Sequence, residues 1–168
     1  ISFSFSSLVF LRDSYLSNIG LTQDDSVFFI VLTAAGAWLA DAGAYFIGRF
    51  FGRHKLAPVI SPNKTVEGFI GGIAVNMLGF ALAGWIYSVC FACTVNYPFL
   101  LILSVVSALL GALGDLTASY IKRSCNIKDF GNIMPGHGGI LDRFDSLLLV
   151  SPFLYLMIRL VHPLWPII

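Results

Sequence analysis

The chain has 168 residues, of which 57% are hydrophobic and only 11% are charged, with a formal net charge of +1. Soluble domains carry about 25% charged residues, and one small core could not bury this much apolar surface, so a soluble globular domain is excluded and an integral membrane protein is expected. The small net charge gives no indication of nucleic-acid binding.

The first segment, residues 1–24, differs from the apolar runs that follow it. The opening residues alternate serine with phenylalanine, and the charged residues Arg12, Asp13, Asp24 and Asp25 come after them. We expect this segment to lie outside the hydrocarbon layer, partly at the membrane interface. The chain starts without Met or a signal-peptide pattern, and we interpret it as the C-terminal part of a larger polytopic protein.

Apolar stretches predict membrane-crossing helices. No Asp, Glu, Lys or Arg occurs from Gly68 to Gly114, a stretch more than twice the roughly 20 residues that one span needs. The run Thr94-Val-Asn-Tyr-Pro98 supplies a turn within it. We therefore predict an all-α integral membrane protein, one catalytic domain built on a bundle of about four transmembrane helices. The predicted spans are residues 26–48, 66–93, 98–121 and 143–163, with Pro152 expected to kink the last.

The cations indicate how these spans are oriented. All but two of the ten Lys and Arg residues lie in two loops, one between the first and second spans and one between the third and fourth. Because the second and third spans cross the membrane twice, both loops fall on one side, and the positive-inside rule makes that side cytoplasmic. The loop cations are Arg49, Arg53, Lys55, Lys64, Lys122, Arg123, Lys128 and Arg143.

Carboxylates recur at helical spacing around the second charged loop. Asp115, Ser119 and Lys122 are four and three residues apart, so they share one helix face. Asp115 lies inside the predicted span, where a carboxylate costs roughly 2.5–3.5 kcal/mol, so it should face a polar cavity or a cation. Asp142 and Asp145 share one face of the next predicted helix, and such oxygen ligands beside phosphate-binding cations suit Mg²⁺.

Simpler interpretations stay open for single residues. Asp142 and Asp145 could complement a helix macrodipole, and Lys122 with Arg123 could be stop-transfer charges. These interpretations explain poorly why an acid lies inside a span. For His137, a structural hydrogen bond is favoured over metal ligation, with a phosphate or base contact between the two.

The first charged loop contains a second candidate anion site. Ser61 is expected to cap a helix that has Pro62 at its first position. Lys64 would then lie in the first turn beside free N–H groups and help to hold a polyphosphate. The alternative is a capped membrane helix with an interfacial lysine. Gly68, Gly71 and Gly72 would allow close helix packing.

Two further features bear on the site. Asp41 lies inside the first span, with Tyr45 four residues later. It could pair with a cation, a metal or a nucleotide, or form a purely structural hydrogen bond. The run Gly136-His-Gly-Gly139 would let backbone N–H groups approach an anion just before a helix N-terminus.

Two blocks carry these residues, "ADAGAYFIGRFFGRHKLAPVISPNKTVEGFIGG" and "GDLTASYIKRSCNIKDFGNIMPGHGGILDRFD". Together they resemble the signatures of phosphatidate cytidylyltransferases, also called CDP-diacylglycerol synthases. The resemblance covers about residues 38–150. Many polar identities recur at fixed spacing, which makes the match specific. The matching positions of the second block are Ser119, Lys122, Arg123, Lys128, Asp129, His137, Gly138, Gly139, Asp142, Arg143 and Asp145.

The resemblance implies transfer of the cytidylyl group of CTP to phosphatidate, giving CDP-diacylglycerol and pyrophosphate for phospholipid biosynthesis. It implies Mg²⁺ as cofactor, with a second cation such as K⁺ left open. The expected partners are CTP, phosphatidate and membrane lipid; a homodimer is left open. The expected location is a bacterial inner membrane with the site facing the cytoplasm, and an organelle is the alternative.

These considerations give the candidate site residues. The candidate catalytic residues are Asp115, Lys122, Arg123, Lys128, Asp129, Asp142 and Asp145. The candidate substrate-binding residues are Asp41, Lys64, Ser119, His137, Gly138, Gly139 and Arg143. The candidate metal ligands are Asp115, Asp142 and Asp145.

Other functions predict a different sequence motif or different products. A CDP-alcohol phosphotransferase would carry a D-G-x-x-A-R…G-x-x-x-D-x-x-x-D run, which is absent from the sequence. A CTP-dependent lipid kinase would release CDP, whereas cytidylyl transfer releases pyrophosphate. A transporter with carboxylates in its pathway would show flux without CTP turnover, and the two-block match disfavours it.

Overall fold

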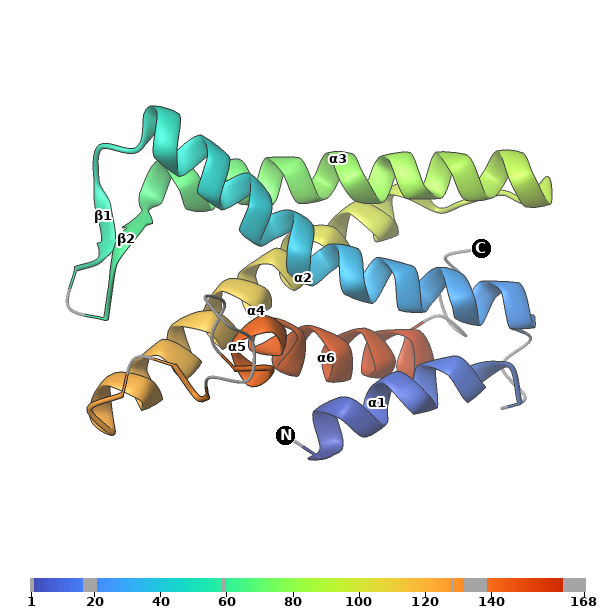
Figure 1. The fold of residues 1–168 in the computed structure, drawn as a ribbon. Helices are drawn as coiled ribbons and strands as arrows, with labels where there is room; N and C mark the ends of the chain where they lie inside the picture. Colours follow the sequence, from blue (N-terminus) through green and yellow to red (C-terminus); the bar gives the residue numbers. More distant parts are fainter. Residues whose placement is uncertain (1, 17–20, 59, 128, 132–138, 162–168) are drawn as a thin grey trace.

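The computed structural model describes residues 2–16, 21–58, 60–127, 129–131 and 139–161 (Figure 1). Within these residues the chain is mostly helical, as predicted. A 3₁₀ turn, Asp13–Leu16, follows the first helix. The helices and strands are α1 (Ser2–Arg12), α2 (Gln23–Phe51), β1 (Lys55–Ala57), β2 (Ser61–Thr65), α3 (Val66–Phe91), α4 (Tyr97–Ser124), α5 (Leu141–Phe144) and α6 (Leu147–Leu160).

Three helices, α2, α3 and α4, are long and apolar enough to cross a membrane. They have 29, 26 and 28 residues, more than the roughly 20 that a span needs. Large apolar side chains such as Trp38, Leu78 and Trp85 are exposed on them, which suits surfaces that face lipid. The membrane class is therefore confirmed, and α2, α3 and α4 fall where the first three spans were predicted.

The predicted fourth span, residues 143–163, is wrong in its start and its continuity. The described part of this region forms a short helix, α5, and then α6, which has 14 residues. At 1.5 Å per residue α6 is about 21 Å long, less than the hydrocarbon thickness of about 30 Å. The interruption falls at Asp145 and Ser146, where the Asp145 side chain accepts a hydrogen bond from the Ser146 N–H at 2.8 Å.

The loop between α2 and α3 adds a small antiparallel sheet of β1 and β2 to the helical architecture. The prediction that Ser61 caps a helix is wrong, because Ser61 begins β2. The N-cap of α3 is Thr65, whose hydroxyl accepts from the Gly68 N–H at 3.1 Å. Pro62 favours extended backbone at the residue before it, which suits a strand better than a helix start. Lys64 therefore lies on a strand.

Glycines bring α2 and α3 together, as predicted. A Cβ atom on Gly68 would lie 2.6 Å from the Ala44 carbonyl oxygen and 2.9 Å from the Gly48 Cα. A Cβ atom on Gly72 would lie 2.6 Å from the Ala40 carbonyl oxygen. Backbone atoms cannot move aside as a flexible side chain can, so these positions require glycine for the observed approach.

The first prediction concerns this helix contact. We expect Gly68→Ala to destabilise the protein by about 1–3 kcal/mol, the usual range for overpacking, and to lower its Tm in detergent. Gly111→Ala is the matched control, because its added Cβ would meet its nearest atom at an ordinary 3.6 Å. Equal Tm values for the two variants would contradict this account of the α2–α3 contact.

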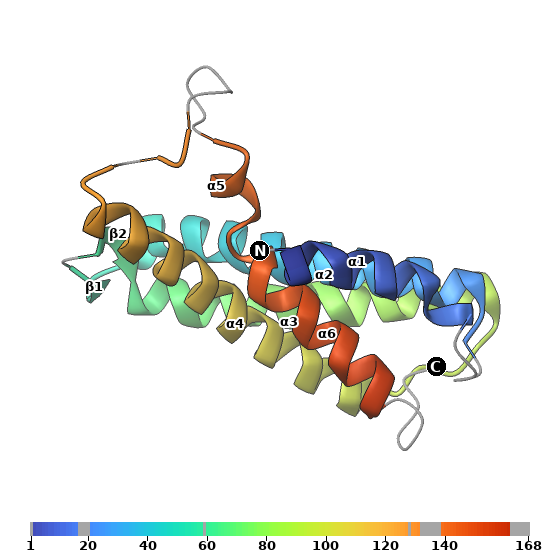
Figure 2. The ribbon, with the colours of Figure 1, turned by 90° about the horizontal axis from the view of Figure 1, so that it is seen from below.

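The β1–β2 hairpin and the C-terminal end of α4 lie at the same end of the bundle (Figures 1 and 2). The connection between α3 and α4 lies at the other end. There Asn96 caps α4 with Pro98 in its first turn, so the predicted turn is confirmed. The described parts of the two charged loops thus adjoin the same end of the helices, and their place relative to a membrane stays a prediction.

Candidate active site

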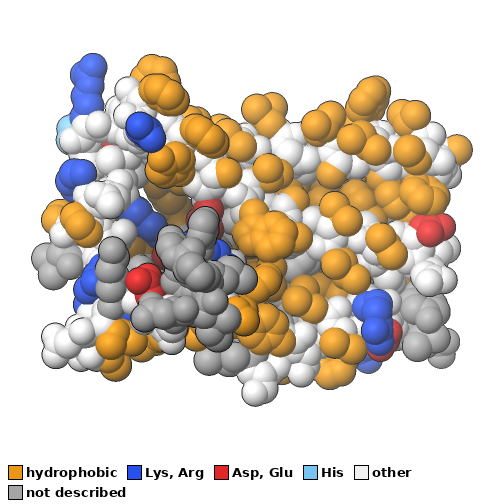
Figure 3. All heavy atoms as spheres, in the orientation of Figure 1, with side chains coloured by type: hydrophobic (Ala, Val, Ile, Leu, Met, Phe, Trp, Pro, Cys, Tyr) orange, Lys and Arg blue, Asp and Glu red, His pale blue; other side chains and the backbone are white. Residues whose placement is uncertain are grey.

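A cavity of about 500 Å³ opens at the end of the bundle that carries the charged loops. Acids from different elements line it: Asp41 from α2, Asp115 from α4, Asp142 from α5 and Asp145 from the turn after α5, together with Lys64 from β2. Figure 3 shows most of the charged side chains of this face gathered at the same end, around a hollow. Residues far apart in sequence therefore meet in one polar site.

Asp115 is paired with Lys64. The Lys64 ammonium forms an ion pair with the Asp115 carboxylate, and both side chains are partly exposed. The Ser119 hydroxyl donates to the other Asp115 oxygen at 3.3 Å. The predicted need of this intramembrane acid for a cavity and a cation is thus met, and the ion pair links β2 to α4.

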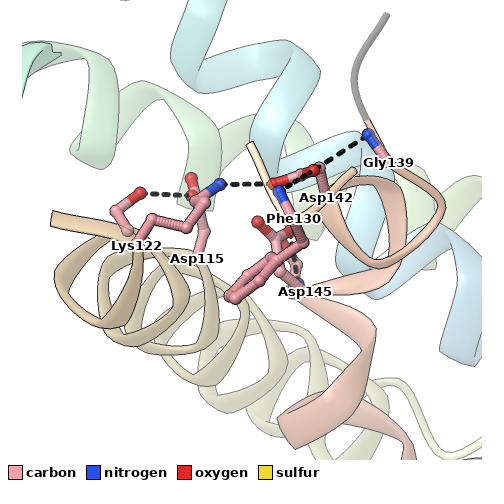
Figure 4. A network of polar contacts seen from close by, with 8 residues as sticks. Asp115, Lys122, Phe130, Gly139, Asp142 and Asp145 are labelled. Carbon is pink, nitrogen blue, oxygen red and sulfur yellow. Dashed lines mark hydrogen bonds and ion pairs between the residues drawn. The ribbon is translucent and has the colours of Figure 1, made fainter. Parts of the chain in front are cut away.

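Asp142 is held by three donors (Figure 4). Lys122 Nζ lies 2.6 Å from Asp142 Oδ1, and the N–H groups of Phe130 and Gly139 donate to Oδ2 at 2.9 and 3.0 Å. The Lys122 and Asp142 side chains are only 12% and 8% exposed. Burial by itself raises the pKa of Asp142, but the hydrogen bonds from Lys122, Phe130 and Gly139 outweigh it and hold the pKa below its ordinary value. Asp142 is therefore ionised at neutral pH.

The remaining two acids meet at Ser146. Its hydroxyl donates to Asp41 Oδ2 at 2.6 Å, and its N–H donates to Asp145. Asp145 lies outside the three spanning helices, and burial, followed by the negative charge of Asp115, raises its pKa to about 6. The acids are close enough for their charges to repel one another.

The comparison with known proteins decides the family. The sequence model described as "Cytidylyltransferase family" matches residues 1–161. The chain belongs to the cytidylyltransferase family. The resemblance predicted from the two sequence blocks is thereby confirmed.

Two bacterial relatives illustrate the similarity. It is 44% identical to the phosphatidate cytidylyltransferase of Bacillus subtilis (strain 168) over 151 residues, 90% of this chain and 52% of the relative. It is 44% identical over 137 residues to that of Staphylococcus haemolyticus (strain JCSC1435), 82% of this chain and 51% of the relative. The chain spans about half the length of these curated relatives.

The acids of this candidate site have the donor chemistry for Mg²⁺. Carboxylate oxygens are hard ligands, and a bound cation would relieve the repulsion among these acids. Among the described residues, however, no three Asp, Glu, His or Cys side chains form a ready group of metal ligands. The ammonium groups of Lys64 and Lys122 neutralise Asp115 and Asp142 instead.

Some predicted residues of the cytidylyltransferase signature lie outside this cluster. Arg123, Asp129 and Arg143 are exposed and are not part of the described cavity lining. Lys128, His137 and Gly138 lie outside the described residues.

Gly139 belongs to the site through its backbone. A Cβ atom there would lie 2.8 Å from the Gly131 nitrogen and 3.1 Å from Asp142 Oδ2. Glycine at this position lets the chain reach the carboxylate closely enough to donate its N–H.

The sequence interpretation of the cytidylyltransferase site missed two contributors. Phe130 donates its backbone N–H to Asp142 and places its ring 5.3 Å from Lys122 Nζ, a cation–π contact. A backbone donor has no side-chain signal in a sequence. Ser146 joins Asp41 to Asp145, and its position directly after an acid is the one clue that the sequence offered.

Proposed function

We propose that this chain forms the catalytic part of a phosphatidate cytidylyltransferase, which transfers the cytidylyl group of CTP to phosphatidate. The observation that carries the proposal is the meeting of four acids and Lys64, from separate elements, in one cavity at the end of three apolar helices. The name of the bacterial relatives supports it. A cavity at the end of membrane helices suits a reaction between a lipid and a nucleotide.

The reaction needs little acid–base help. A phosphate monoester has a second pKa of about 6, so phosphatidate is largely dianionic at neutral pH. One of its phosphate oxygens attacks the α-phosphorus of CTP and forms a new P–O bond. The bond from that phosphorus to the oxygen bridging the β-phosphate breaks, and pyrophosphate leaves with the electron pair. The difficulty lies in bringing two polyanions together and stabilising the leaving group.

The described residues suit that task. Lys64 and Lys122 supply positive charge for phosphate groups, while their partners Asp115 and Asp142 hold them in position. Mg²⁺, held by Asp115, Asp142 and Asp145, would neutralise charge on the transferring phosphate groups. Phosphate-binding roles for Arg123, Lys128, Arg143 and the segment His137–Gly139, a catalytic role for Asp129, and a second cation such as K⁺ stay predictions.

The arrangement also suggests where the substrates meet. The acyl chains of phosphatidate would stay in the bilayer, and its head group would reach the charged end of the bundle. CTP would arrive from water on the same side. The cationic loops favour the cytoplasmic side of a bacterial inner membrane. A homodimer stays a prediction.

The second prediction tests this function. The full-length protein in membranes, supplied with phosphatidate, Mg²⁺ and CTP labelled at the α- or γ-phosphate, should give α-labelled CDP-diacylglycerol and γ-labelled pyrophosphate. Chelation of Mg²⁺ should stop both products. Release of CDP would show a kinase, and flux without CTP turnover would show a transporter; either result would contradict the proposal.

A further inference from the structure

Two residues at the rim of the cavity lie apart from the four acids and their lysine partners. Tyr45 and Arg49 line the cavity from α2, and Arg49 Nη1 donates to the Tyr45 hydroxyl oxygen at 2.9 Å. They are four residues apart, so they share one face of the helix. The hydrogen bond fixes the direction of a long, flexible cation at the cavity mouth.

Among the described residues that line the cavity, Arg49 is the cation that forms no ion pair with an acid. The other described cation in the lining, Lys64, is paired with Asp115. Within the described part of the chain, Arg49 forms no ion pair with a carboxylate. Its guanidinium has five N–H donors, and the contact with Tyr45 uses one of the two terminal nitrogens. The rest of this planar fork matches the geometry of a phosphate group.

The rim lies beside an apolar surface suited to lipid. Tyr45, Phe46 and Phe50 are 58%, 59% and 74% exposed on the last turns of α2. Arg49 is eight residues from Asp41, so about 12 Å of helix separates the rim from that deeper acid. A lipid whose tails lie along these aromatic side chains would bring its phosphate to Arg49 first.

We propose that Arg49, oriented by Tyr45, binds the phosphate monoester of phosphatidate at the membrane-facing rim of the cavity. This inference rests on the proposed function and deepens it. It distinguishes a binding site for the lipid phosphate from the phosphate-binding positions at Lys64 and Lys122. A phosphate of CTP offers the same chemistry to a guanidinium. The exposed aromatic surface next to Arg49 favours the lipid as the source.

The third prediction tests this subsite by steady-state kinetics of the full-length protein in mixed micelles. Arg49→Ala should raise the KM for phosphatidate about tenfold or more, as expected for loss of a charge-assisted phosphate contact, and leave the KM for CTP within about twofold. Arg49→Lys should raise the KM for phosphatidate less, since lysine keeps the positive charge but lacks the planar guanidinium that can form two parallel hydrogen bonds. Tyr45→Phe should give a smaller rise still. The matched control is Arg53→Ala, which is exposed and outside the cavity lining, and its KM values should equal those of the unaltered protein.

A binding measurement keeps the test independent of turnover. Without CTP, the unaltered protein should bind short-chain phosphatidate more tightly than uncharged diacylglycerol, and Arg49→Ala should lose this preference while its Tm is unchanged. If Arg49→Ala lowers the Tm, the kinetic and binding comparisons made with Arg49→Lys decide the question.

Each contrary result has a separate meaning. A rise in the KM for CTP alone would make Arg49 a nucleotide contact and overturn the lipid subsite. If Arg49→Ala changes neither KM nor the preference for phosphatidate, the contact between Arg49 and Tyr45 is only a hydrogen bond on the helix surface. That result would also overturn the lipid subsite. If the unaltered protein forms no CDP-diacylglycerol, the proposed function fails, and the binding measurement still reports on the phosphate site.

Discussion

Replacing Asp142 by Asn is expected to lower turnover at least a hundredfold while the protein still inserts into the membrane. The substitution preserves the shape of the side chain and removes the charge that Lys122 contacts at 2.6 Å. Loss of one preorganised electrostatic contact in an active site costs about 10²–10³ in kcat. The measurement is the rate of pyrophosphate release by the full-length protein in membranes.

The control for this fourth prediction is Asp24→Asn. Asp24 is exposed in the first turn of α2, at the end of the bundle away from the cavity. It makes the same chemical change without touching the site, so its turnover should match that of the unaltered protein. Because loss of a buried charge partner also destabilises, the Tm of Asp142→Asn must be measured first. A folded Asp142→Asn protein with near-normal turnover would refute the role given to this carboxylate.

The fifth prediction concerns the ion pair between Lys64 and Asp115. Lys64→Met should lower kcat/KM about tenfold to a hundredfold, because a hydrogen bond to a charged group contributes about 1.5–3 kcal/mol. Methionine keeps the length of the side chain and removes the charge. Lys55→Met is the matched control on the neighbouring strand β1, where the lysine is exposed. Equal losses in the two variants would mean that the hairpin acts through its general charge.

A double variant shows whether Lys64 and Asp115 act as a unit. Paired residues are non-additive, so Lys64→Met with Asp115→Asn should lose less activity than the two single losses combined. Full additivity would indicate that the ion pair has no part in the reaction.

Much of the architecture followed from a simple physical constraint on the sequence. The charge-free stretch from Gly68 to Gly114 must avoid water, so it predicted two spans, and α3 and α4 occupy it. The cost of an acid inside a span predicted a cation for Asp115. The identity of that cation was not predictable, because Lys64 lies on a strand whose path depends on how α2 and α3 pack.

Local competition explains what the sequence interpretation got wrong. Ser61 and Thr65 are both N-cap residue types, and only the backbone direction set near Pro62 separates a strand from a helix start. The interruption between α5 and α6 falls at Asp145 and Ser146, and apolar periodicity does not reveal it. The hydrogen bond from the Ser146 hydroxyl to Asp41 likewise depends on how α2 packs against the residues between α5 and α6.

The central claim is that acids and cations from separate elements form one site for the reacting phosphate groups. The most direct test is an experimental structure of the full-length protein with Mg²⁺ and a non-hydrolysable CTP analogue. The account predicts that the α-phosphorus lies within the cavity, between the ammonium groups of Lys64 and Lys122. A nucleotide bound instead in the surface depression lined by Phe50, Arg53 and Glu67, or Asp115 and Asp142 found in separate sites, would contradict it.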